Sequence, residues 1–394
     1  MYDVVIVGGG IVGLSTGMAI YEKYPGIKLL VIEKESEVAK HQTGNNSGVI
    51  HSGIYYTPGS FKARFAKQGS KEMQEFCKKH DVPYDMCGKV IVASNEEELP
   101  LLEDLYERGL ENELDIEKID QARLKEIEPH IAGVAGIRVP QAGIVDYTAV
   151  SKKFTEIIQS NGGEILLDTE LIKIKEHSDS VTLETSKGNF EAKLAINCAG
   201  LHSDRVAEAT GYKTDMKIVP FRGEYYVLKP EKRYLVNNLI YPVPNPKFPF
   251  LGVHFTRMID GTIEAGPNAV LGFKREGYKK TDISMKDTFE SILFPGLWRL
   301  GGKFVKEGIS EYARSFSKAM FTKSLQKMIP EITEDDLIPA PAGVRAQAIT
   351  SDGQMVDDFE IIEGKRSIHV CNAPSPAATA SIGIGKEVAN RVKL

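Results

Sequence analysis

The sequence predicts an α/β fold, in which a Rossmann-like domain is assembled from separated parts of the chain and joined to a second, β-rich α+β domain. Three observations predict it. The first 33 residues read as strand, helix and strand; a similar alternation returns near residue 149 and again near residue 367; and the segments between are rich in strand patterns. We therefore expect one domain from residues 1–80, 145–215 and 335–394, and a second from 81–144 and 216–334.

The N-terminal unit carries the clearest periodicity. Residues 4–7 form a continuous apolar run, typical of a parallel strand buried on both faces. Residues 11–24 have helical spacing, and residues 28–32 form a second apolar run. Together they predict a βαβ unit.

The next segment mixes helices with short strands. Apolar residues recur every three or four positions from 58 to 80, which predicts an amphipathic helix. A strand at 89–93, a helix ending near residue 110 and a strand at 136–140 follow, as an insertion outside the first domain. A helix at 149–160 and a short strand at 164–167 resume the alternation.

Strand patterns dominate the centre of the chain. Short strands are expected at 171–175, 180–185 and 190–192, and the apolar run 193–200, which ends in small residues, suits a central strand. Residues 217–272 are also β-rich, and repeated proline in 241–244 excludes a helix there. Helices are expected within 287–328, and the tail predicts a strand at 367–371 and a helix at about 377–392.

The amino-acid composition narrows the classes of function that we expect. A net charge of −5 and a pI near 6.0 supply no general cationic field, so small molecules are expected as ligands rather than nucleic acid. The four cysteines have neither metal-ligand spacing nor a disulfide framework. The most apolar stretch, residues 4–20, contains five glycines and is better explained as strand, turn and helix than as a membrane span. With Met1 leading directly into a strand, we expect a cytoplasmic protein with free thiols.

A glycine motif joins the first strand to the first helix. Gly8, Gly10 and Gly13 match G-x-G-x-x-G, and Glu33 closes the second strand 20 residues after Gly13. Gly8 permits the tight turn, Gly10 lets the backbone approach a pyrophosphate at the helix N-terminus, and Gly13 lets helix and strand pack closely. Glu33 would accept hydrogen bonds from ribose hydroxyls. The arrangement predicts a dinucleotide site.

Three distant features favour FAD over NAD, and an acid at position 33 disfavours NADP. They are the small-residue segment 41–48, the strand end at 197–200 and the start of the terminal helix near 377–382, whose dipole would lie near the flavin ring. We expect noncovalent FAD, because no cysteine occupies an attachment position; His51 is the residue to check for linkage. The predicted contacts are Gly8, Gly10, Ile11, Val12, Gly13, Glu33, Lys34, Thr43, Gly44, Asn45, Ser47, Gly48, Val49, Leu171, Ala199, Gly200, Arg345, Ala377, Ala378 and Thr379.

At these residues the chain resembles the D-amino-acid oxidase superfamily of FAD enzymes, and within it the L-2-hydroxyglutarate dehydrogenase/oxidase family. The resemblance spans nearly the whole chain, through residues 41–56 (HQTGNNSGVIHSGIYY), 221–226, 254–257, 266–269, 343–347 and 372–379. It implies oxidation of L-2-hydroxyglutarate to 2-oxoglutarate, with electrons passed to a membrane quinone pool or another acceptor.

Such chemistry needs a neutral base for the hydroxyl proton and cationic groups for a dicarboxylate. His51 in the flavin-proximal loop and His254 in the substrate domain are both candidate bases. Arginine binds carboxylates bidentately, so Arg345, Arg257 and Arg222 are candidate substrate contacts, although Arg222 could instead pair with Glu224. Tyrosine offers a hydroxyl beside an apolar wall, and the candidates are Tyr55, Tyr56, Tyr225 and Tyr226.

Residues 291–328 carry seven basic residues (Arg299, Lys303, Lys306, Arg314, Lys318, Lys323 and Lys327) against two acidic ones (Glu307 and Glu311), interleaved with aromatic and aliphatic residues. This pattern fits peripheral docking on an anionic membrane. We expect instead the commoner arrangement, with the apolar face packed on the core.

Two further hypotheses stay open at this point. One is an amine or amino-acid oxidase of the same superfamily, and the other is a flavin-binding redox protein without turnover.

Overall fold

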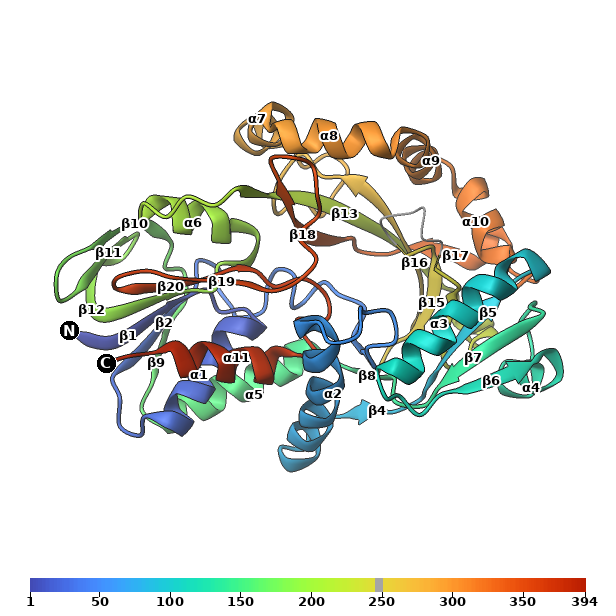
Figure 1. The fold of residues 1–394 in the computed structure, drawn as a ribbon, viewed down its shortest axis with the longest axis horizontal. Coiled ribbons are helices and arrows are strands. Elements are labelled where there is room, and N and C mark those ends of the chain that lie inside the picture. Colours follow the sequence, from blue (N-terminus) through green and yellow to red (C-terminus); the bar gives the residue numbers. More distant parts are fainter. Residues whose placement is uncertain (245–250) are drawn as a thin grey trace.

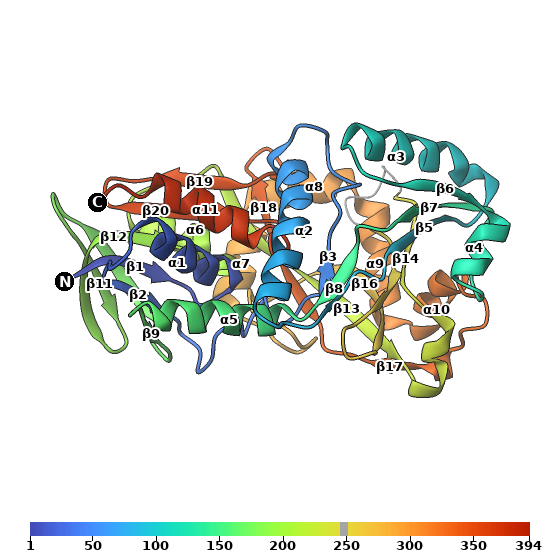
Figure 2. The same cartoon turned by 90° about the horizontal axis from the view of Figure 1, so that it is seen from below.

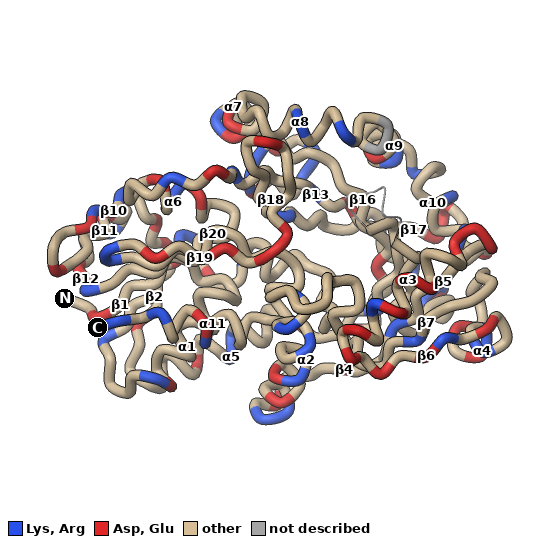
Figure 3. Tube along the Cα trace, viewed as in Figure 1, with Lys and Arg blue, Asp and Glu red and all other residues tan. Residues whose placement is uncertain are grey.

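The computed structural model describes residues 1–244 and 251–394, apart from the side chains of residues 306 and 307. Lys306 and Glu307, which entered the charge count above, therefore lie outside the described side chains. An eight-stranded sheet forms one end of the molecule and a nine-stranded sheet the other, on the left and right of Figure 1. Figure 3 shows basic and acidic residues interspersed along the trace, as the nearly balanced composition leads one to expect.

The first sheet contains the expected parallel strands. Its core runs in the order β9 (Glu164–Leu166), β2 (Leu29–Ile32), β1 (Tyr2–Val7), β12 (Gly188–Asn197) and β20 (Ser367–Asn372). The strands β10 (Leu171–Glu176), β11 (Val181–Thr185) and β19 (Glu360–Glu363) add antiparallel pairs. Val7 is in register with Ile32 and Asn197, so three strands end at one edge, where ligands of parallel sheets bind.

Three helices, α1 (Ile11–Lys23), α5 (Tyr147–Ser160) and α11 (Ser381–Arg391), cover one face of this sheet. Small residues let them approach closely: a Cβ on Gly17 would lie 2.8 Å from Ile158 Cδ1, and one on Gly385 2.6 Å from the Ser15 backbone. Helix α2 (Phe61–Lys79) packs on α11 and lies between the two large sheets in both views (Figures 1 and 2). The first sheet and its helices are thus the Rossmann-like layer that the sequence predicts.

The second sheet is mostly antiparallel. Its order is β17 (Leu337–Pro339), β13 (Met216–Leu228), β16 (Ile263–Leu271), β15 (His254–Arg257), β14 (Leu239–Pro242), β5 (Lys89–Ala93), β7 (Ala135–Val139) and β6 (Glu117–Asp120), with β18 (Gly343–Thr350) also on β13. Helices α4 (Gln121–Ile127) and α10 (Lys318–Gln326) contribute to the core on one face, and α3 (Leu99–Glu111) to the core on the other. A three-stranded sheet joins β3 (Val49–Ile50), β8 (Gly143–Val145) and β4 (Tyr84–Asp85).

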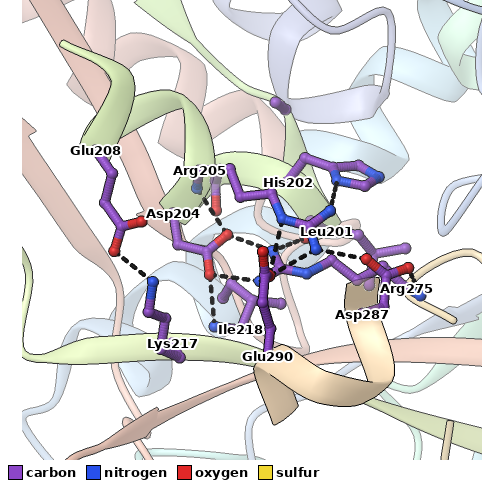
Figure 4. A network of polar contacts seen from close by, with 12 residues as sticks. Leu201, His202, Asp204, Arg205, Glu208, Lys217, Ile218, Arg275, Asp287 and Glu290 are labelled. Carbon is purple, nitrogen blue, oxygen red and sulfur yellow. Dashed lines mark hydrogen bonds and ion pairs between the residues drawn. The ribbon is translucent and has the colours of Figure 1, made fainter. Parts of the chain in front are cut away.

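A buried ion-pair network ties α6 (Ser203–Ala209), on the first sheet, to the start of the helical arm α7 (Met285–Leu293), α8 (Pro295–Lys303) and α9 (Val305–Phe316) (Figure 4). Arg275 is 2% exposed and donates to Asp204 Oδ2 at 2.8 Å and to the Leu201 carbonyl at 2.7 Å. Arg205 bridges Asp287 and Glu290. Removing one partner of a buried ion pair leaves an unpaired charge in the interior, which lowers the free energy of unfolding by about 3–5 kcal/mol. The network therefore anchors the arm.

The structure confirms most of the predicted elements and changes two. Residues 188–197 form one strand instead of two, ending at Asn197. The terminal helix begins at Ser381 rather than 377, because residues 377–380 are held in turns by bonds from the Ala377 and Ala380 amides to the Pro374 and Pro376 carbonyls, both 2.9 Å. No described helix is long and apolar enough to cross a membrane, and the four cysteines are free.

The expectation that the apolar residues of 291–328 pack on the core is wrong for part of them. Phe294, Leu297 and Phe304 do pack inward against Leu300 and the second sheet. However, Leu293 is 75%, Trp298 65% and Phe316 81% exposed. The helices are short and lie along the outer edge of the molecule, so only one side of each has protein to cover it (Figure 1).

Candidate active site

A cavity of about 1210 Å³ runs from the β1–α1 turn to the second sheet. Typical small-molecule pockets measure about 300–1,000 Å³. Its lining includes Gly8 and Glu33 at one end and His51, His254 and Arg345 at the other. It therefore has room for an extended ligand that reaches from the carboxyl edge of the first sheet to the face of the second.

The glycine turn has the geometry that the motif predicts. Gly8 has φ +110°, and a Cβ there would lie 2.5 Å from the Cys198 carbonyl oxygen. A Cβ on Gly13 would lie 2.1 Å from the Gly8 carbonyl oxygen, so this glycine sets the approach of α1 to the turn. Gly10 differs: its φ is −79°, and the nearest atom to an added Cβ is Thr43 Oγ1 at 3.5 Å. The space beside Gly10 thus opens into the cavity, at the N-terminus of a helix with no acidic residue in its first turn.

Glu33 lies at the end of β2 and lines the same end of the cavity. Its carboxylate accepts hydrogen bonds from the Gly9 amide at 2.7 Å and the Glu35 amide at 3.0 Å, and each oxygen keeps a further lone pair for a ligand hydroxyl. Beside it, Glu35, His41 and Glu276 have the spacing of a metal-ligand cluster. The Lys34 ammonium contacts Glu35 at 2.8 Å and Glu276 at 2.7 Å, so this cluster is an ion-pair network.

The loop that carries His51 is fixed to the C-terminal segment through Thr379. The His51 amide donates to Thr379 Oγ1 at 3.1 Å, and the Tyr147 hydroxyl lies 2.9 Å from the same oxygen. Both hydroxyls reach the Val49 carbonyl, at 2.9 and 3.2 Å. Thr379 is fully buried and does not line the cavity, which corrects its predicted role as a cofactor contact: it positions the His51 loop instead.

His254 is held between a backbone carbonyl and a tyrosine ring. Its Nδ1 lies 2.8 Å from the Gly252 carbonyl oxygen, and its ring stacks on Tyr241 with centroids 3.9 Å apart. A carbonyl only accepts, so in the neutral imidazole Nδ1 carries the proton and Nε2 carries the lone pair. Nε2 is therefore the unprotonated nitrogen of the neutral His254 ring.

Burial controls the protonation of both histidines. It lowers the pKa of His51 to about 3, with the Lys89 charge adding to the effect, and it lowers the pKa of His254 to about 3 as well. Both imidazoles are therefore neutral near pH 7. Burial also raises the pKa of Tyr55 well above its usual value, so its hydroxyl stays protonated. That hydroxyl lies at the cavity wall, buried and without a hydrogen-bond partner among the described residues.

The structure separates the candidate arginines. Arg345, on β18 opposite Phe221 of β13, lines the cavity. Arg257 does not: its guanidinium forms an ion pair with Asp85, so the prediction of a substrate role for Arg257 is not supported. The physical reason is strand alternation, since His254 and Arg257 lie three residues apart on β15 and point to opposite faces. Arg222 pairs with Glu224 at 2.9 Å, the structural alternative considered above.

Most of the predicted residues meet in this one cavity. The lining includes His51, His254, Tyr55, Arg345, Gly8, Gly10, Ile11, Val12, Glu33, Lys34, Thr43, Asn45, Ser47, Val49, Leu171, Ala199, Gly200, Ala377 and Ala378. Gly13, Gly44, Gly48, Thr379 and Arg257 are outside it. Gly13, Gly44 and Gly48 are instead required by the backbone conformation. A Cβ on Gly44 would lie 2.5 Å from the Ala39 carbonyl oxygen, and Gly48 has φ +63°.

Several residues at the histidine end have no counterpart in the sequence prediction. Tyr241 stood out only as part of a proline-broken strand, yet it forms a wall of the cavity and stacks on His254. Lys62, at the start of α2, also lines the cavity and places its ammonium 5.3 Å from the centroid of the Tyr56 ring. Lys89 opens β5 and is 2% exposed, although lysine is rarely buried. The sequence did contain one signal for Lys89, because it is a charged residue at the start of an otherwise apolar strand.

The residues present fit FAD. A glycine turn at a helix N-terminus suits a pyrophosphate, Glu33 suits a ribose, and the cavity continues past the turn far enough for a ring system beside His51. The orphaned Tyr55 hydroxyl indicates that a polar ligand group completes the far end.

Comparison with known proteins agrees with this geometry. The family model described as "FAD dependent oxidoreductase" (DAO) matches residues 3–391. An L-2-hydroxyglutarate dehydrogenase of Indibacter alkaliphilus is 53% identical over 389 residues, covering 98% of each chain. That of Escherichia coli K12 is 46% identical and covers 100% of this chain and 93% of its own, and the mitochondrial one of Homo sapiens is 45% identical, covering 100% and 89%.

Solved structures give the same picture. A dithionite-reduced L-α-glycerophosphate oxidase of Mycoplasma pneumoniae with FAD bound superposes with a TM-score of 0.81 at 25% identity, over 100% of this chain and 95% of that one. A glycine oxidase of Bacillus cereus shares the fold, with a TM-score of 0.73 at 17% identity over 99% and 94% of the chains. The chain belongs to the DAO family of FAD-dependent oxidoreductases.

Proposed function

We propose that this protein oxidises L-2-hydroxyglutarate to 2-oxoglutarate with FAD as its cofactor. The observation that carries the chemistry is the pair of neutral histidines facing one cavity with Arg345, where His254 keeps Nε2 as a free base because Nδ1 donates to a carbonyl. The substrate is inferred from relatives at 45–53% identity over almost the whole chain, which carry the name L-2-hydroxyglutarate dehydrogenase.

The reaction removes a proton from the hydroxyl oxygen and a hydride from the carbon that bears this hydroxyl group. FAD, when bound, supplies the two-electron acceptor. His254 accepts the hydroxyl proton at Nε2, and the Gly252 carbonyl stabilises the imidazolium that forms through the Nδ1–H bond. Arg345 binds a substrate carboxylate through its planar guanidinium. The Tyr55 hydroxyl donates to a substrate oxygen, which satisfies its missing hydrogen bond.

Product formation tests this assignment. We expect the FAD-loaded protein with an artificial electron-accepting dye to form 2-oxoglutarate from L-2-hydroxyglutarate and not from the D enantiomer. Glycine and sarcosine are the controls for the amine-oxidase alternative. Turnover of either amine with no 2-oxoglutarate formed would contradict the substrate, and no turnover of any of them would favour a redox protein without this activity.

We propose that FAD is held noncovalently. The thiolate is the form of cysteine that attacks a flavin, and burial raises the pKa of the Cys198 and Cys371 thiols at the cavity to about 12. Acid denaturation of the loaded protein should release the flavin into the supernatant. Flavin that stays with the precipitate would contradict this, and His51→Asn would then test that histidine as the attachment point.

We also propose that the electrons leave to a lipid-soluble quinone while the protein docks on an anionic membrane. The supporting observation is the exposed apolar side of the helical arm, where Phe289 is 53%, Leu293 75%, Trp298 65%, Ile309 66% and Phe316 81% exposed. The basic residues Arg299, Lys303 and Lys323 are exposed on the same arm and on α10. Aromatic and aliphatic groups flanked by cations are typical of helices that lie in a membrane interface.

Liposome co-sedimentation measures this docking. Replacing Leu293, Trp298 and Phe316 by serine should abolish binding to vesicles that contain anionic lipid, and Lys303→Glu with Lys318→Glu should weaken it in a salt-dependent way. Leu110→Ser is the matched control, because Leu110 is 49% exposed on α3, away from the arm. Equal binding by the triple variant and wild type would refute the proposal.

A further inference from the structure

Lys89 is a fully buried lysine beside the cavity, and neither the family assignment nor the proposed mechanism gives it a role. It begins β5, where Lys89, Ile91 and Ala93 share one side of the strand. Ile91 and Ala93 belong to the same apolar core as Tyr241, which Tyr55 also contacts. The Lys89 side chain therefore points to the side of the sheet that carries the histidine end of the cavity.

Two tyrosine rings separate the ammonium from the cavity. The Lys89 Nζ lies 4.0 Å from the centroid of the Tyr241 ring and 5.2 Å from that of Tyr55, and both tyrosines line the cavity. His254 stacks on Tyr241 at 3.9 Å. One face of a ring has room for only one group at such a distance, so the ammonium and the imidazole occupy opposite faces of Tyr241.

The charge of Lys89 has no counter-ion in the part of the chain that the structure describes. Among the described residues, no carboxylate lies within 4.0 Å of its Nζ, whereas the buried Arg222 pairs with Glu224 and the buried Arg275 pairs with Asp204. The faces of two tyrosines compensate only part of the cost of burying an ammonium. In keeping with this, burial lowers the pKa of Lys89 to about 7. A buried cation of this kind is stabilised strongly by any anion that enters beside it.

We propose that Lys89 determines specificity for the second carboxylate of a dicarboxylate substrate: an anion seated in the cavity at Tyr55 supplies the counter-charge that the described residues around Lys89 lack. Arg345 and Lys89 then divide the two carboxylates between them. Lys89 acts across the tyrosine wall, so it is a positioning residue and takes no part in proton or hydride transfer. The inference rests on the proposed function, since it assumes a dicarboxylate in this cavity.

A pH-dependent affinity follows from linkage. If the anion binds only the ammonium form, binding takes up one proton at pH values above the pKa of the free lysine. Affinity should then fall about tenfold per pH unit as the pH rises above about 7. Other ionisable groups that face this region are Cys87, His51, His254, Tyr55, Tyr241, Tyr225, Lys62, Arg345 and Glu264. Burial raises the pKa of Glu264 to about 7, inside the same window, and it lowers the pKa of Lys62 from its usual 10.5.

The experiment is calorimetric titration of the FAD-loaded protein with glutarate from pH 6 to 9, and with butyrate as the probe that lacks the second carboxylate. For Lys89→Met we expect glutarate affinity at pH 6 to drop by about tenfold or more, with the pH slope lost and butyrate affinity unchanged. Lys89→Arg, which stays charged throughout, should keep the affinity at pH 6 and also lose the slope. Glu264→Gln is the matched control and should keep the slope.

The outcomes separate this inference from the function on which it rests. A pH slope that survives in Lys89→Met or Lys89→Arg, or a slope that disappears in Glu264→Gln, overturns the role of Lys89. Equal losses of glutarate and butyrate affinity also overturn it, because they indicate a role in folding rather than in recognising the second carboxylate. Failure of wild-type protein to accept L-2-hydroxyglutarate in the dye assay overturns the proposed function instead.

Discussion

Replacing Gly10 by alanine should weaken FAD binding without harming the fold. Gly10 has a φ of −79°, which alanine adopts without strain, and the nearest atom to the new Cβ is Thr43 Oγ1 at 3.5 Å, an ordinary contact. Alanine is a poorer N-cap than glycine, so the free energy of unfolding of the apoprotein should fall by about 1 kcal/mol, too little to unfold it. The added methyl group instead projects into the space where the pyrophosphate approaches the helix N-terminus.

The expected loss can be estimated from the contacts at stake. Hydrogen bonds from backbone amides to a charged phosphate contribute about 1.5–3 kcal/mol each, so the loss of one such bond weakens FAD binding about 10- to 150-fold. The assay is titration of apoprotein with FAD, followed by quenching of flavin fluorescence, with thermal unfolding of the apoprotein measured in parallel.

Two other glycines serve as references. Gly13→Ala should destabilise the apoprotein itself, because its Cβ would lie 2.1 Å from the Gly8 carbonyl oxygen. Gly301→Ala on α8, with nothing within 4 Å, should leave FAD binding unchanged and stabilise the apoprotein by up to about 1 kcal/mol. Wild-type FAD affinity in Gly10→Ala would refute the placement of the pyrophosphate at this turn.

Further predictions concern the histidines. His254→Asn should slow anaerobic flavin reduction by about 10²- to 10⁴-fold, the usual contribution of a general base, and His51→Asn should slow it less; the reverse order would transfer the role of base to His51. His369 is fully buried, and burial lowers its pKa from 6.5 to about 4. As the pH falls, the unfolded chain therefore binds a proton first, and about 3 kcal/mol of stability is lost between pH 6.5 and 4. In His369→Gln this part of the acid destabilisation, measured by urea unfolding at several pH values, should disappear; an unchanged pH dependence would show that other groups cause it.

The geometry of the glycine turn could be predicted from the sequence because its signals are local. The turn through Gly8, Gly10 and Gly13 lies between one strand and one helix, and Glu33 follows at a fixed spacing. Backbone sterics alone demand glycine at Gly8 and Gly13, because a Cβ there would lie 2.5 Å and 2.1 Å, respectively, from a backbone carbonyl oxygen. Strands buried on both faces, such as β1 and β5, are similarly visible as unbroken apolar runs.

The arrangement of the end of the cavity that contains His51 and His254 could not be predicted from the sequence, because it is formed by contacts between distant segments. Lys89, Tyr241 and His254 are adjacent only because β5, β14 and β15 pair side by side, an order that periodicity does not reveal. Arg257 was predicted because arginine binds carboxylates, but the order in which residues alternate along a short strand decides which face it meets, and Arg257 lies outside the cavity lining. Thr379 was predicted to contact the cofactor because it lies next to Ala377 and Ala378. In the structure its hydroxyl instead binds the His51 amide and the Tyr147 hydroxyl.

The outward apolar side of the helical arm had no sequence signal of its own. An amphipathic helix has the same pattern whether its apolar side meets a protein core or a lipid surface. Only the placement of α7, α8 and α9 along the edge of the molecule distinguishes the two (Figure 1).

If one cavity brings FAD together with an L-2-hydroxy dicarboxylate, the substrate should reduce the flavin directly, and anaerobic absorbance spectroscopy of the FAD-loaded protein measures this. Addition of L-2-hydroxyglutarate should bleach the flavin band near ~450 nm, while D-2-hydroxyglutarate, glycine and sarcosine leave it unchanged. A flavin band that persists with the L-hydroxy acid, or that is bleached by an amine instead, would contradict the account.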